Sequence, residues 1–144
     1  MDANLAGVSV GGLLFIIGIL FYLRWKLPYR LKIKHFLGDW KDLQELCRDK
    51  STWKLAIIDA DKLVEKALKK RKYKGKSMGE RMVDAQRVFT DNPGLWAAHN
   101  LCKKIVSNPK RVLSESIVKK ALISYRQALK DLGALPNAHT KKRK

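Results

Sequence analysis

Residues 53–70, WKLAIIDADKLVEKALKK, decide the fold that we expect for this chain. Their apolar side chains recur every three or four residues, which is the spacing of one face of an α-helix. That face comprises Ile57, Ala60, Val64, Ala67 and Leu68. The helix runs into the basic segment 69–76, KKRKYKGK, where lysines suit the negative end of the helix dipole and Gly75 is the expected stop. Since one apolar face needs neighbours to cover it, the pattern predicts a bundle.

Three more helices are expected downstream. Ser77-Met78-Gly79-Glu80 is a capping box, in which the Ser and Glu side chains satisfy free backbone amides at a helix start. Asn92 is the expected N-cap of the next helix, with Pro93 in its first turn, and Asn108-Pro109 ends it. A last helix begins near Ser114 and stops at Gly133. The stripes expected to face inward are Leu95, Ala98, Cys102 and Ile105, then Ile117, Val118, Ala121, Leu122, Tyr125, Ala128, Leu129 and Leu132.

Upstream, residues 35–50 contain a short amphipathic helix from about Asp39. No segment has the pattern of a strand. We therefore expect an all-α chain with a small antiparallel helical bundle over 51–133, preceded by a basic juxtamembrane segment at 24–50. The remainder, 134–144, is a polar basic tail that we expect to be disordered.

The N-terminal stretch 5–23, LAGVSVGGLLFIIGILFYL, has 19 residues and no charge. As a helix it would be about 29 Å long, which matches the ~30 Å hydrocarbon core of a bilayer. The basic residues next to this stretch all come after it, beginning with Arg24. The positive-inside rule therefore places the N-terminus outside and the C-terminal domain in the cytoplasm. The sequence thus predicts a single-pass protein of the cell membrane.

Glycines in this helix have the spacing of a packing face. Gly7 and Gly11 form a GxxxG pair, and Gly18 falls on roughly the same side. Small residues there would let two helices approach closely and form a homodimer. The alternative is that glycine is simply common in membrane helices.

Charge is concentrated after the apolar stretch. All 31 Lys and Arg and 12 of the 13 Asp and Glu lie in residues 24–144, which therefore carry a formal charge of +19. Such a surface attracts anions, either the headgroups of acidic lipids or RNA. The candidate phosphate contacts are Lys69, Lys70, Arg71, Lys72, Lys74, Lys103 and Lys104.

The sequence contains little that indicates catalysis. It has no Gly-rich phosphate loop, no HExxH and no GxSxG, and we expect no metal and no cofactor. His99 and Cys102 are three residues apart on one helix, so a Cys–His pair is feasible, but a partly buried structural histidine is the commoner case. Asp61 and Glu65 share a helix face and are expected to pair with lysines. Cys47 and Cys102 are expected to be buried free thiols.

Four segments in order resemble small bacterial proteins with an HEPN-like helical domain. They read WKLAIIDADKLVEKAL, YKGKSMGERM, LWAAHNLCKKIVSNP and ALKDLG, within about 50–133. The resemblance implies an antiparallel bundle that often dimerises and, in many members, a metal-independent ribonuclease with Arg, a polar residue and His on its third helix. In this chain those positions hold Cys102, Lys103 and Ser107. Both the Arg and the His that the resemblance implies are therefore missing, so the motif is degenerate and we expect no catalytic residues.

Three classes of function follow. The first is a non-enzymatic, membrane-tethered helical module that recruits a protein partner. The second is a tethered module that binds RNA or nucleotides through its basic face. The third, an HEPN-type ribonuclease, is disfavoured because its motif is degraded.

Overall fold

The computed structural model describes the backbone of residues 3–26 and 30–137 and the side chains of residues 10–25 and 30–137. Within these residues the chain is all-α, as predicted, and has no strand. The elements are the helices α1 (Ala3–Lys26), α2 (Ile33–Leu46), α3 (Trp53–Lys70), α4 (Met78–Asp84), α5 (Asn92–Ser107) and α6 (Glu115–Asp131), with a short 3-10 helix, η1 (Lys50–Thr52), before α3.

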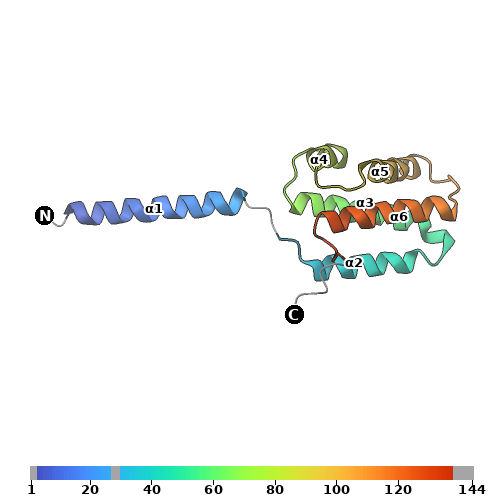
Figure 1. Ribbon diagram of the computed structural model, residues 1–144, viewed down its shortest axis with the longest axis horizontal. Coiled ribbons are helices and arrows are strands. Elements are labelled where there is room, and N and C mark those ends of the chain that lie inside the picture. The colour runs from blue at the N-terminus through green and yellow to red at the C-terminus, as the bar shows by residue number, and fades with distance from the viewer. Residues whose placement is uncertain (1–2, 27–29, 138–144) are drawn as a thin grey trace.

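α3 is the central helix of the bundle, in contact with α2, α4, α5 and α6 (Figure 1). Its predicted apolar stripe is confirmed, since Ile57, Ala60, Val64 and Leu68 have no exposed surface. α2 covers one side of α3 and α6 another, and α5 packs on both α3 and α6. The face of α3 that meets these neighbours is apolar, whereas Lys62 and Lys66 on its other face are exposed.

α2 begins six residues before the predicted start at Asp39 and belongs to the same core. Phe36, Trp40 and Leu43 are buried in that core. The expected inward stripe of α6 is confirmed except at Ile117, which is 44% exposed. α4 is short, and after it the chain continues in turns before α5.

The end of α3 differs from the prediction at one residue. The helix closes inside the basic run, but Lys72, rather than Gly75, is the left-handed residue that stops it, with φ 62°. The amide of Tyr73 donates to the Leu68 carbonyl at 3.1 Å, and that of Lys72 to the Lys69 carbonyl at 3.0 Å. These two bonds make a Schellman motif, which usually has glycine at this position. A side chain there costs about 1–2 kcal/mol.

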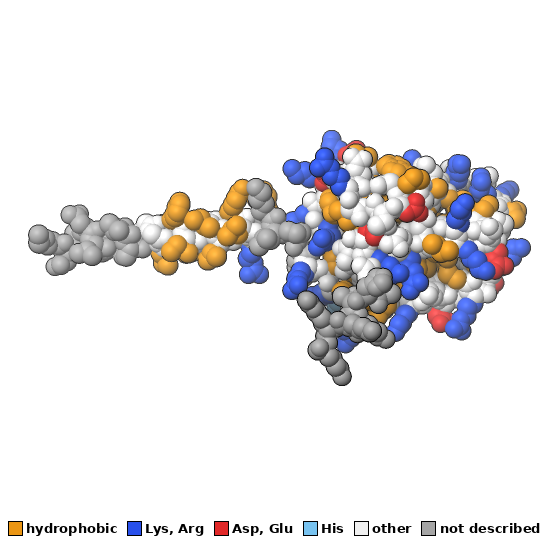
Figure 2. Space-filling view, viewed as in Figure 1, with side chains coloured by type: hydrophobic (Ala, Val, Ile, Leu, Met, Phe, Trp, Pro, Cys, Tyr) orange, Lys and Arg blue, Asp and Glu red, His pale blue; other side chains and the backbone are white. Residues whose placement is uncertain are grey.

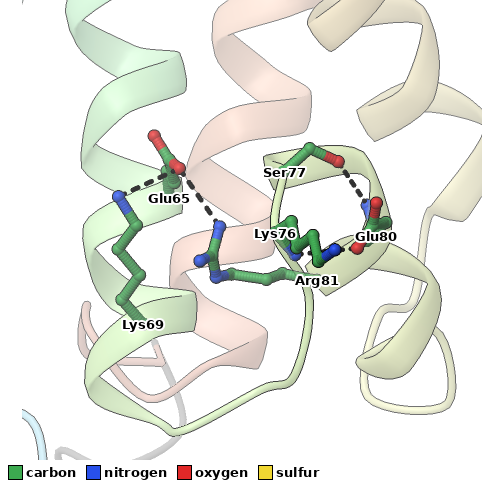
Figure 3. Close-up of polar contacts among 6 residues, drawn as sticks. All are labelled: Glu65, Lys69, Lys76, Ser77, Glu80 and Arg81. Carbon is green, nitrogen blue, oxygen red and sulfur yellow. Dashed lines mark hydrogen bonds and ion pairs between the residues drawn. The ribbon is translucent and has the colours of Figure 1, made fainter.

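The predicted capping box at the start of α4 is confirmed in its first half (Figure 3). Ser77 Oγ accepts from the Glu80 amide at 3.2 Å. The Glu80 carboxylate accepts at 2.7 Å from the amide of Lys76, one residue before the expected donor. At α5 the prediction was wrong by one residue: the N-cap is Asp91, which accepts from the Gly94 amide at 2.9 Å.

α6 is bounded as predicted. Ser114 is its N-cap, and Gly133, with φ 75°, forms the Schellman motif at its end. The expected disorder directly after it is wrong for Ala134 and Leu135, because both side chains are buried in the core. The amide of Ala134 donates to the Leu129 carbonyl at 2.8 Å as part of that motif. Residues 138–144 of the predicted tail lie outside the described residues.

α1 extends away from the bundle (Figure 1). In the described part of the chain, no helix has the length and apolar character needed to cross a membrane, so the structure does not support the predicted transmembrane span. Of that span, the side chains of residues 5–9 lie outside the described residues. The described side chains of α1, residues 10–25, are all exposed.

Replacing Gly94 with Ala is expected to lower the free energy of unfolding by about 1–3 kcal/mol, through overlap and loss of a helix cap. A Cβ at this position would overlap Oδ2 of Asp91 and lie 2.7 Å from Oγ of Ser124. Denaturant unfolding followed by circular dichroism measures the change. The matched control is Gly38→Ala in α2, where a Cβ meets nothing within 4 Å. That variant is expected to gain about 0.5–1 kcal/mol, and a similar loss at both positions would contradict the assignment.

Candidate functional site

The chemically richest group of side chains lies where α3, α5 and α6 meet. We call it the Asp61 cluster; it consists of Asp61, His99, Cys102 and Tyr125. Oδ1 of Asp61 accepts a hydrogen bond from the Tyr125 hydroxyl at 2.9 Å and lies 2.9 Å from Nδ1 of His99. The side chains of Asp61 and His99 are 14% and 13% exposed, and Tyr125 is fully buried. A carboxylate so enclosed needs these donors to offset its lost hydration.

The protonation states of the cluster follow from this arrangement. An ionised carboxylate only accepts hydrogen bonds, so this contact fits a tautomer of His99 in which the Nδ1–H group donates a hydrogen bond to Oδ1 of Asp61. Burial, the charge of Asp61 and a hydrogen bond to Asp61 raise the pKa of Cys102 to about 12. The same causes, burial first, raise the pKa of Tyr125 above its ordinary value of 10.0. At neutral pH the cluster therefore holds a neutral thiol and a neutral phenol.

This arrangement does not activate a Cys–His nucleophile pair. The thiolate is the reactive form of cysteine, and the surroundings of Cys102 disfavour it. The imidazole Nδ1 is occupied by Asp61 instead of the thiol. The ring of His99 also packs against Trp96, edge to face, with centroids 6.2 Å apart. The cluster therefore joins three helices through one carboxylate.

The three degenerate HEPN-like positions, Cys102, Lys103 and Ser107, lie on α5 but do not share one surface. Cys102 points into the core, whereas Lys103 is exposed. Oγ of Ser107 donates to the Lys104 carbonyl at 3.1 Å in the last turn of the helix. These positions thus offer no imidazole to move a proton, which the implied ribonuclease chemistry requires.

The predicted phosphate contacts fall into two groups. Lys103 and Lys104 lie on α5, while the other five belong to the end of α3 and the loop after it. Several in the second group already have partners. Lys69 pairs with Glu65 at 3.1 Å, as expected for that acid, and Glu65 also pairs with Arg81 at 3.4 Å (Figure 3). Nζ of Lys70 lies 6.0 Å from the centre of the Phe36 ring.

The remaining predicted site residues are in α1. Of the glycines expected to pack against a second helix, Gly11 and Gly18 have open space around them, with nothing within 4 Å of an added Cβ. Gly7 lies outside the residues whose side chains are described. Cys47 is half-buried, and burial raises its pKa. Among the described residues, no group of three or more His, Cys, Asp or Glu side chains could hold a metal ion.

The role of Asp61 was not predicted, because this residue was expected to pair with lysines. A signal was present: Asp61 is four residues after Ile57 and three before Val64, so it sits at the edge of the apolar stripe. Charged residues at such positions are buried only when paired. The sequence could not identify the partners, because His99 and Tyr125 come from helices 38 and 64 residues away.

Comparisons with known proteins identify no relative. No protein family, no curated protein and no solved structure matches this chain.

The Tyr125 hydroxyl is expected to contribute to stability as a donor to a buried carboxylate. Tyr125→Phe should lower the free energy of unfolding by about 1.5–3 kcal/mol, the usual range for a hydrogen bond to a charged group. Tyr73→Phe is the matched control, since the Tyr73 hydroxyl makes no hydrogen bond with the described residues, and it should change stability little. If denaturant unfolding showed equally small changes in the free energy of unfolding for both variants, Asp61 would not depend on the Tyr125 hydroxyl.

The raised pKa values predict a loss of stability in alkali. The pKa of Cys102 is about 12 in the folded chain, whereas the unfolded thiol has the ordinary pKa of 9.0. Above pH 9 the unfolded state thus binds fewer protons, so the free energy of unfolding falls as pH rises toward 12. Cys102→Ala should reduce this slope by up to about 1.4 kcal/mol per pH unit. An unchanged slope in urea unfolding at stepped pH would mean that the thiol ionises freely in the folded chain.

Proposed function

We propose that this chain is a non-enzymatic helical interaction module that α1 holds at a membrane. The observation that carries the proposal is the exposure of apolar side chains along α1. Residues such as Phe15, Phe21 and Trp25 are 72–75% exposed, and orange side chains follow the described part of the helix (Figure 2). Soluble proteins rarely leave a large contiguous apolar surface uncovered. Insertion into lipid would remove that surface from water.

The junction between α1 and the bundle supports attachment to an acidic membrane surface. Nζ of Lys72 donates to the carbonyl oxygens of Trp25 at 2.8 Å and Arg24 at 3.4 Å. This contact places the basic loop after α3 beside the end of the proposed anchor. Lys and Arg near an anionic leaflet each contribute about 1 kcal/mol of attraction. We therefore propose anionic lipid headgroups as a partner of this end of the bundle.

Two features support a role without catalysis. The thiol of Cys102 stays protonated at neutral pH, and Nδ1 of His99 is bonded to Asp61. If the resemblance to HEPN-like domains reflects kinship, we propose that this copy has lost the ribonuclease activity and keeps the bundle as a platform for a cytoplasmic partner. The proposed location is the cell membrane, with the bundle on the cytoplasmic side.

Flotation of the full chain with liposomes tests the attachment. We expect the protein to float with vesicles of phosphatidylcholine and phosphatidylglycerol and to stay bound after washes in high salt and in alkaline carbonate, because apolar burial is insensitive to both. The double variant Ile16→Asp/Leu20→Asp should float at least about tenfold less, since a charge within the apolar helix costs about 2.5–3.5 kcal/mol.

Ile123→Asp is the matched control, because Ile123 is similarly exposed but lies on the bundle. It should float like the unchanged protein. Failure of the unchanged protein to float would contradict the tether. Release by carbonate alone would contradict a spanning helix and leave surface attachment.

A further inference from the structure

α5 and α6 enclose a groove of about 820 Å³ that the proposed tether does not use. Its floor consists of small residues, among them Gly94, Ala97, Ala98, Ala121 and Ser124. Two isoleucines of α6 are exposed there, Ile117 by 44% and Ile123 by 68%. Apolar side chains that gather in one groove with a polar rim are characteristic of an interaction site.

The groove follows from a second stripe on each of the two helices. On α5 the core stripe Leu95, Ala98, Cys102 and Ile105 is accompanied, one residue earlier each time, by Gly94, Ala97, Leu101 and Lys104. On α6, Ile117, Lys120 and Ser124 likewise precede buried residues of the core. The α5 stripe keeps helical spacing over more than two turns and the α6 stripe over about two turns. The open space between them therefore follows the helices and suits an elongated occupant.

The charge around the groove is one-sided. Lys104, Arg111 and Lys120 are exposed, and none of the three forms an ion pair with any residue in the described part of the chain. The one acidic lining residue, Asp91, is already engaged, because it accepts from the Gly94 amide and lies 3.5 Å from Oγ of Ser124. A complementary occupant thus carries acidic side chains beside an apolar stripe.

We propose that this groove binds an acidic amphipathic helix of a partner protein. Apolar side chains of that helix at positions i, i+4 and i+7 would pack on the floor and on the two isoleucines, as in other helix-in-groove complexes. Its flanking Asp and Glu would meet the three cations. A second copy of this chain is disfavoured, since residues 24–144 carry a formal charge of +19. Residues 141–144 of the chain itself, KKRK, are basic and contain none of the acidic side chains that the three cations would attract.

This inference rests on the proposed role as an interaction module and names the class of partner. The test uses the full chain in zwitterionic detergent micelles and a fluorescent peptide of about four helical turns, with Leu at i, i+4 and i+7 and Glu beside them. We expect saturable binding by fluorescence anisotropy. Peptides with the same composition but no apolar stripe, or with Lys in place of Glu, should not bind.

Variants of the protein locate the site. Ile123→Asp and the double variant Lys104→Glu/Lys120→Glu should each weaken binding by about tenfold or more. The matched controls Val106→Asp and Lys103→Glu change exposed residues of α5 outside the groove and should bind like the unchanged protein. Thermal unfolding by circular dichroism verifies that all variants are folded.

The inference would be overturned if the acidic peptide did not bind, or if the Lys peptide bound equally well. It would also be overturned if the groove and control variants weakened binding equally. A short RNA that displaced the peptide, and whose own binding was weakened by the same groove variants, would likewise overturn it. A concentration-dependent dimer in sedimentation that Ile123→Asp abolishes would instead identify a second copy as the occupant. Liposome flotation of the same variants separates the two proposals. If flotation is normal while the peptide fails to bind, the groove assignment is wrong and the tether stands.

Discussion

One carboxylate, that of Asp61 on the central helix, sets how three helices of the bundle fit together. It accepts from Tyr125 of α6 and pairs with His99 of α5, each at 2.9 Å. Apolar packing tolerates small rotations of a helix, but a buried charge left without its donors costs several kcal/mol. The rotation of α5 and α6 about their own axes is therefore fixed by this contact. That rotation also decides which of their side chains face outward, and so it shapes the groove between them.

Much of the fold was predictable because the signals are local. The span of α3, the Ser caps of α4 and α6 and the left-handed Gly133 all follow from short-range spacing and backbone preference. α2 began earlier than predicted, since Ile33 to Leu37 have a weak pattern until the contact of Phe36 with the core is known. The choice of Asp91 over Asn92 as N-cap was equally hidden, because both residue types cap helices well.

The candidate site was less predictable than the fold. The pattern identified His99 and Cys102 as neighbours on a helix, but their chemistry depends on Asp61, which lies 38 residues from His99. A local sequence pattern does not show which residues this far apart in the chain come into contact after folding. The same limit applies to the basic residues: composition gave their number, whereas only the folded chain separates Lys69, held by Glu65, from Lys104 and Lys120, which form no ion pair among the described residues.

Lys72 places a locally unfavourable conformation at the junction between α1 and the bundle. Glycine would suit its φ of 62° better, but glycine has no amine to reach the end of α1. The loop is thus frustrated: its backbone preference and its distant contact favour different residues. The loop is also tied to α4, because the amides of Lys74 and Lys76 donate to Asp84 and Glu80, both at 2.7 Å. One short loop therefore joins the end of α1, through the Lys72 side chain, to α4, through two backbone amides.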